Sequence, residues 1–134
     1  MKRLIPAGLL AGLIVNLVDV PNSAIVVSPR WVAFLEAHNI TLNVPLVSAF
    51  YTTLHFLYGI AIAYAYVIAR DRYGAGIRTA LASTGFLLLL HRAFGLGMVV
   101  MGTMPLSIYL MFSASMILGS LLGGVAAAKV LDRA

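Results

Sequence analysis

The feature of this sequence that most constrains its fold is a succession of four long apolar runs. They cover approximately residues 4–27, 45–69, 79–102 and 106–131. Each run exceeds the roughly 20 apolar residues that a helix needs to cross the hydrocarbon core of a bilayer. Hydrophobic residues make up 62% of the chain and charged residues 10%, whereas a soluble domain is nearer to about 45–50% and 25%. The sequence therefore predicts an all-α integral membrane protein, a four-helix bundle that forms one domain of 134 residues.

A short amphipathic helix is expected between the first and second spans. The segment SPRWVAFLEAHN begins at Ser28, which is a good N-cap residue, and continues with Pro29, which favours the first turn of a helix. Its apolar residues can share one face, and Trp31 suits the level of the lipid head groups. We therefore predict a helix that lies in the membrane interface. In the first span, Pro21 is expected to kink the helix because it lacks a backbone N–H.

The basic residues predict the orientation in the membrane. Cytoplasmic loops carry an excess of lysine and arginine. Of the nine basic residues, Arg30 lies on one side of the spans, Arg92 lies within the third span, and the remainder lie on the other side: Lys2, Arg3, Arg70, Arg72, Arg78, Lys129 and Arg133. Both termini are therefore expected in the cytoplasm.

The composition also excludes several functions. The formal net charge is +5, but the basic residues gather at span ends, where they suit contact with anionic lipid. No basic patch is interleaved with aromatic residues, so nucleic acid is not an expected partner. The chain has no cysteine, which excludes disulfides, thiolate metal sites and thiol catalysis.

Small residues recur along two spans with helical spacing. Gly8 and Gly12 share a face of the first span, and the last span repeats a small residue at every fourth position: Ser115, Gly119, Gly123 and Ala127. Helices in lipid associate through such stripes because small residues let two backbones approach closely. We expect close helix contacts at both stripes, with a partner helix either in the same chain or in another copy.

Polar residues from three spans are expected at one depth in the bilayer. At a rise of about 1.5 Å per residue, seven side chains fall between the midplane and the outer leaflet: Asn16, Asp19, Tyr51, His55, Tyr58, His91 and Arg92. We call this set the polar layer. Ionisable residues at such depth usually pair inside the bundle, so we predict an ion pair between Asp19 and Arg92. The alternative is a proton or ion path.

The polar layer leaves several functions open. His55 and His91 could ligate a b-type haem between two helices, or the layer could hold a quinone; otherwise the histidines hydrogen-bond within it. A zinc site would need more ligands, because Asp19 is the only carboxylate within a span. The spacing of serine, histidine and aspartate makes no catalytic triad. We therefore predict a non-enzymatic accessory or scaffolding subunit, self-associated or bound to a larger membrane complex.

Three short segments carry a resemblance to a known group of proteins. The motifs AGLIVNLVD, RWVAFLEAHN and RYGAGIRTAL resemble those of a family of small bacterial four-span inner-membrane proteins to which no function is assigned. The resemblance implies a bacterial inner-membrane protein with four helices. It implies no mechanism.

Overall fold

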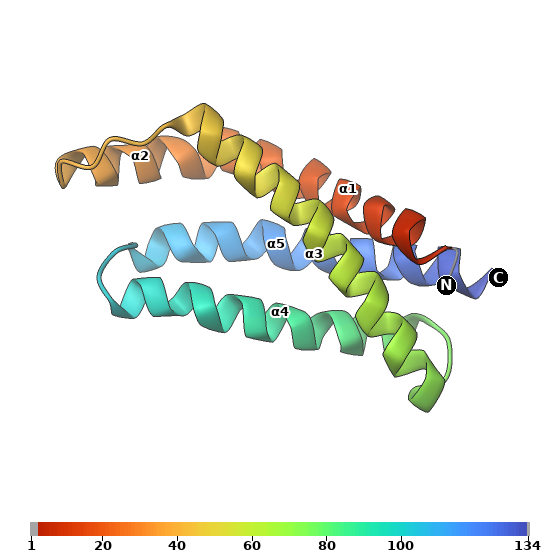
Figure 1. The fold of residues 1–134 in the computed structure, drawn as a ribbon. Helices are drawn as coiled ribbons and strands as arrows, with labels where there is room; N and C mark the ends of the chain where they lie inside the picture. Colours follow the sequence, from red (N-terminus) through yellow and green to blue (C-terminus); the bar gives the residue numbers. More distant parts are fainter. Residues whose placement is uncertain (1–2, 134) are drawn as a thin grey trace.

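Four long helical rods make up the structure (Figure 1). The computed structural model describes residues 3–133, so Lys2 and Ala134 lie outside the described part. The first rod consists of α1 (Leu4–Asn22), a π-helical segment η1 (Ser23–Val27) and α2 (Ser28–Ala37), and the others are α3 (Val44–Tyr73), α4 (Ile77–Val100) and α5 (Leu106–Asp132). All four rods are long and apolar enough to cross a membrane. The predicted all-α four-helix bundle is confirmed.

The expected interfacial helix is instead a continuation of the first span. The predicted helix is present as α2, but the backbone stays helical from Leu4 to Ala37, so the prediction that Ser28 caps the start of a separate helix is wrong. Pro21 lies inside α1, and the wider turn of η1 follows it, which accommodates the missing N–H without ending the helix. A helix of 34 residues measures about 51 Å, against about 30 Å for the hydrocarbon core. One rod can therefore pass from the core into the head-group region without turning to lie along it.

Glycine and a capped start determine where the rods end. α3 runs four residues further than expected, to Tyr73, and Gly74 and Gly76 then adopt φ angles of 83° and 124°. Only glycine adopts these values without strain, which permits the short reversal into α4. At the other end of α3, the Asn43 side chain accepts a hydrogen bond from the Leu46 N–H at 3.1 Å, as an N-cap residue does.

The two ends of the bundle differ in what they carry. The described chain ends lie together with the α3–α4 turn at one end, which we call the terminal end; the α2–α3 and α4–α5 connections lie at the other, distal end (Figure 1). Arg3 donates to the Arg133 carbonyl at 3.3 Å and links the chain ends. α3 crosses the bundle diagonally, from beside the first rod at the distal end to beside α4 at the terminal end (Figure 1). α3 and α4 therefore diverge toward the distal end.

The small-residue stripes lie where helices contact one another most closely. A Cβ atom built on Gly8 or Gly12 would lie 2.6 Å from the Cα of Ile60 or Phe56 of α3. A Cβ atom on Gly59 would collide with the α1 backbone at both glycines. On the other side of α1, the stripe of α5 packs against the first rod, with Gly123 facing the Ala11 carbonyl and Gly119 facing Val15. Both stripes therefore have partner helices within the same chain.

Candidate ligand site in the distal half

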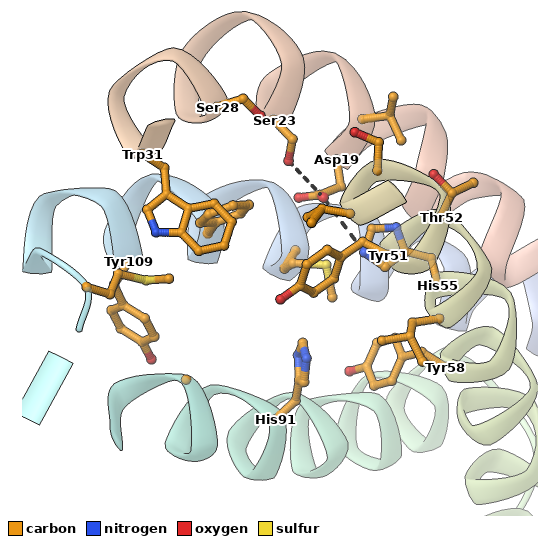
Figure 2. Close-up of a pocket in the computed structure, with 18 of the residues that line it drawn as sticks. Asp19, Ser23, Ser28, Trp31, Tyr51, Thr52, His55, Tyr58, His91 and Tyr109 are labelled. Carbon is orange, nitrogen blue, oxygen red and sulfur yellow. Dashed lines mark hydrogen bonds and ion pairs between the residues drawn. The ribbon is translucent and has the colours of Figure 1, made fainter. Parts of the chain in front are cut away.

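A cavity of about 650 Å³ lies in the distal half of the bundle, where α3 and α4 diverge. All four rods contribute to its wall. Six of the seven polar-layer residues line it: Asp19, Tyr51, His55, Tyr58, His91 and Arg92. Apolar side chains complete the lining, among them Leu57, Met98, Met104, Phe112 and Met116. In Figure 2, Asp19 and His91 project into this space from opposite walls.

The seventh residue, Asn16, lies behind His55 and fixes its orientation. The Asn16 Nδ2 donates to the Thr52 carbonyl at 3.2 Å, so its Oδ1 faces the other way. The His55 Nδ1 lies 2.8 Å from this oxygen, which can only accept. The proton of a neutral His55 must therefore be on Nδ1, and Nε2 is directed toward Asp19 at 3.7 Å. Asn16 and His55 are both 7% exposed, so the network is rigidly enclosed.

The Asp19 carboxylate draws its partners from its own rod and from α5. Ser115 donates to Oδ1 at 2.6 Å and Ser23 donates to Oδ2 at 3.1 Å. Asn22 in turn donates to the Ser115 hydroxyl at 2.9 Å. Asp19 is 5% exposed, and a buried carboxylate requires such donors. Ser115, expected only as a packing residue, is therefore also a polar contact between α5 and α1.

The predicted ion pair between Asp19 and Arg92 is wrong. Within residues 3–133, the basic side chain beside Asp19 is His55, which pairs with it only when protonated, and Arg70 pairs with Asp132. The Arg92 guanidinium instead donates to the Ser113 hydroxyl at 3.2 Å and to His91 Nδ1 at 3.1 Å. It also lies 5.7 Å from the ring centroid of Tyr109, within the range of a cation–π contact. The positions of Asp19 and Arg92 along two parallel helices predicted that they lie at the same depth in the membrane. They did not predict the face of its helix on which each residue lies.

Sequence reasoning missed the residues of α5 that hold Arg92. The Tyr109 hydroxyl donates to the Arg92 carbonyl at 2.8 Å, and Ser113 receives the guanidinium. A signal for both was present, because a very short turn joins α4 to α5. In an antiparallel hairpin of helices, residues equally distant from the turn lie side by side, which places position 92 opposite the turn of α5 that contains Ser113. Trp31, expected at the level of the lipid head groups, also lines the cavity and packs edge-on against Phe112 at a centroid distance of 6.0 Å.

Several hydrogen-bond donors of the cavity wall have no acceptor within residues 3–133. They are buried nitrogen or oxygen atoms of three lining residues: Trp31 Nε1, Tyr58 Oη and Arg92 Nε. The Tyr58 hydroxyl lies near the Ser120 hydroxyl, but within residues 3–133 no hydrogen bond of good geometry joins them. Native structures leave few buried polar atoms unsatisfied. These three atoms have almost no accessible surface, so they lie behind the cavity surface and do not themselves form a site for a ligand.

His91 contributes a hydrogen-bond donor to the cavity wall. Arginine can only donate, so His91 Nδ1 accepts from Arg92, and in the neutral ring Nε2 carries the proton. The ring is tilted against Tyr58 at a centroid distance of 5.3 Å and points into the cavity beside Tyr51 (Figure 2). As an iron ligand, His91 would need the opposite arrangement, with a free electron pair on Nε2. The observed contacts therefore suit hydrogen bonding better than haem ligation.

The chain is thus a small polytopic helical protein of membrane type, with a cavity between its rods that carries polar groups on an apolar wall. No protein-family model, curated protein or solved structure matches it.

Proposed function

We propose that this protein binds a small amphiphilic molecule in the cavity of its distal half, and that it does so without catalysing a reaction. One observation carries the proposal: a cavity of about 650 Å³ with an apolar wall and a few convergent polar side chains. Ligand sites in proteins are typically clefts of about 300–1,000 Å³ with this kind of lining. A quinone-like or lipid-like molecule has the matching character.

The arrangement of the polar layer supports binding over catalysis. Both serines near Asp19 donate to its carboxylate, and the His55 ring contacts Asn16 and Asp19 rather than a serine hydroxyl. A nucleophile activated by a histidine needs a direct hydrogen bond between the two. The α4 wall of the cavity carries the donors of His91 and Arg92, which suits recognition of a polar head.

A b-type haem is a weaker candidate for the same space. The His55 Nε2 has the required electron pair when the ring is neutral, but Asp19 lies 3.7 Å from it. His91 offers a proton instead of an electron pair as long as Arg92 donates to its Nδ1. Binding iron would require both contacts to break. The absorption spectrum of protein expressed with haem supply tests this alternative, since bound haem gives a Soret band.

The proposed location is the bacterial inner membrane, with both termini in the cytoplasm. The basic residues of the terminal end support this orientation under the positive-inside rule, and they include Arg70, Arg72 and Arg78 around the α3–α4 turn. Reporter fusions after Ala134 should be active in the cytoplasm. Fusions active only in the periplasm would reverse the orientation.

The role of an accessory subunit, in a homo-oligomer or a larger complex, stays a prediction. The exposed apolar side chains that would meet a partner, such as Leu89, Phe94 and Val100 of α4, suit lipid equally well.

Two glycines of α4 provide the test of ligand binding. Gly95 lines the cavity, and a Cβ atom there would lie 3.1 Å from the Tyr109 ring. Gly97 has no atom within 4 Å of such a Cβ and is outside the cavity lining. Gly95→Leu should fill the cavity, whereas Gly97→Leu is the matched control on the same helix.

The measurement is mass spectrometry of small molecules extracted from each purified variant. We expect a compound that is retained by the wild type and by Gly97→Leu and is lost from Gly95→Leu. Identical extracts from all three proteins would contradict the proposal.

A further inference from the structure

We propose that the ligand carries an oxyanion head group, a carboxylate or a phosphate, and that Arg92 binds it. This inference rests on the proposed function and names the chemistry of its ligand. It begins from the charge of Arg92. Ionisable side chains within membrane spans usually pair with one another, and Arg92 has no acidic partner within residues 3–133.

Asp19, the acid of the cavity wall, makes no ion pair with Arg92 within residues 3–133. Asp19 accepts from Ser23 and Ser115 and faces His55. It also projects from the wall opposite to α4, as the labelled Asp19 and His91 show (Figure 2). The guanidinium donates its hydrogen bonds to Ser113 and His91 instead.

The donors on the α4 wall indicate which kind of head group fits the cavity. The Arg92 guanidinium and the Nε2–H of His91 belong to residues that line it, and arginine can only donate. Arg92 Nε and Trp31 Nε1 have almost no accessible surface, so they lie behind the cavity surface. A ligand that satisfies the donors of the α4 wall must offer several acceptors and few donors. An oxyanion does so, and its charge strengthens each hydrogen bond.

The neighbours of Arg92 hold it ready for such a head group. Ser113 and His91 each engage one terminal nitrogen, and the ring of Tyr109 packs against the guanidinium. These contacts fix the plane of the guanidinium, and a fixed planar fork is what makes arginine suited to carboxylate and phosphate. The apolar body of the ligand would contact Met98, Met104 and Phe112. Repulsion by Asp19 would keep the head group at the α4 wall.

Trp31 provides a readout confined to this cavity, because it is the only tryptophan of the chain and lines the wall. The protein is placed in nanodiscs of zwitterionic lipid and titrated with three brominated amphiphiles that share one alkyl chain. Their head groups are a carboxylate, a phosphate monoester and a primary alcohol. Bromine quenches indole fluorescence on contact, and concentrations are counted as mole fraction in the nanodisc.

We expect saturable quenching of Trp31 fluorescence. The better of the two anions should reach half-saturation at a concentration on the order of tenfold to a hundredfold below that of the alcohol, which is the range of a charged hydrogen bond. A preference for the carboxylate indicates a fatty-acid-like ligand, and a preference for the phosphate indicates a phospholipid-like one. Arg92→Gln should abolish the preference for anions. Arg78→Gln, which removes an arginine that does not line this cavity, should retain it.

The possible failures are distinguishable. If the alcohol binds the wild type as tightly as both anions, the inference is overturned while the proposed function stands. If none of the three quenches saturably, the proposed function fails as well. The comparison of head groups needs only the wild type, so it decides the matter even if Arg92→Gln does not fold.

Discussion

The two halves of the bundle are packed with different kinds of side chain. In the terminal half, the buried apolar cluster consists largely of alanines, with Tyr66 and Leu131 as its larger members, and glycines bring helix backbones into contact. In the distal half, the buried cluster is built on Val27, Met104 and Ile108, with aromatic side chains packed around it. Beside it lies the cavity of about 650 Å³. In one half, helix backbones meet through small residues, and in the other, large and polar side chains line the cavity.

This difference shows where the shape of the cavity originates. Apolar helices gain no hydrophobic free energy by associating within lipid, so they meet closely only where small residues permit it. Gly59 lies against Gly8 and Gly12 and marks the closest approach of α3 to α1. Beyond that crossing α3 and α4 diverge (Figure 1). The glycines of one half therefore determine the opening in the other.

The largest effect is expected at that crossing. A side chain at Gly59 would collide with the Gly12 N and the Gly8 carbonyl of α1, and backbone atoms cannot move aside as a flexible side chain can. Gly59→Leu should lower the free energy of unfolding by about 3 kcal/mol or prevent folding, at or above the upper end of overpacking costs. Thermal unfolding in detergent measures it.

A glycine with open surroundings is the control. A Cβ atom on Gly85 of α4 would have no neighbouring atom within 4 Å, so Gly85→Leu should leave the melting temperature nearly unchanged. Gly123→Leu should fall between the two, because its Cβ would lie 2.9 Å from the Ala11 carbonyl oxygen. Equal stability of the Gly59 and Gly85 variants would disprove the crossing.

The second effect concerns a hydroxyl that joins three elements at the terminal end. Tyr66 is fully buried; its hydroxyl donates to the Asp132 carboxylate at 2.6 Å and accepts from the Gly76 N–H at 2.9 Å. Tyr66→Phe should cost about 1.5–3 kcal/mol, as hydrogen bonds to charged groups do. Hydrogen exchange should quicken at the α3–α4 turn and the last turn of α5. Tyr64→Phe, at a side chain that is 57% exposed, should change neither the stability nor the exchange rates.

The sequence predicted the spans and the close helix contacts of the small-residue stripes, but not how the side chains of the distal half face one another. The spans were predictable because hydrophobicity over about 20 residues decides membrane insertion. The stripes at Gly8 and Gly119 were predictable because few other features explain small residues at every fourth position. The depth of the polar layer followed from the rise of a helix.

What the sequence could not supply is the rotation of each helix about its axis. Asp19 and Arg92 are level, yet they face different partners, because rotation depends on how all four rods pack. The continuation of α1 into α2 was hidden for a local reason. The sequence has residues typical of a helix boundary at Pro21, Ser28 and Pro29. In the structure, the backbone continues between them as the π-helical segment η1.

A third and smaller effect is expected where α5 contacts the polar layer. Ser115 donates to Asp19 and is 7% exposed. Hydrogen bonds between membrane helices contribute on average about 0.6 kcal/mol and at most about 1.7. Because Asp19 is charged, Ser115→Ala should fall in the upper part of that range. Ser83→Ala is the control, since the Ser83 hydroxyl bonds to the Ala80 carbonyl of its own helix. A cost at Ser83 equal to that at Ser115 would argue against the interhelical contact.

The smallest effect is expected when tyrosine is changed to phenylalanine in the distal half, in contrast to Tyr66→Phe at the terminal end. Tyr51 lines the cavity with a side chain that is 46% exposed, whereas the hydroxyl of Tyr58 is buried without a partner within residues 3–133. Removing an unsatisfied polar group costs nothing and can stabilise. Tyr51→Phe should therefore stay within about 0.5 kcal/mol of the wild type, as changes at exposed positions do, and Tyr58→Phe should be neutral or slightly stabilising, in contrast to Tyr66→Phe. Parallel unfolding curves for the three variants make the comparison. A loss of stability at Tyr58 as large as that at Tyr66 would mean that the Tyr58 hydroxyl forms a hydrogen bond within the protein.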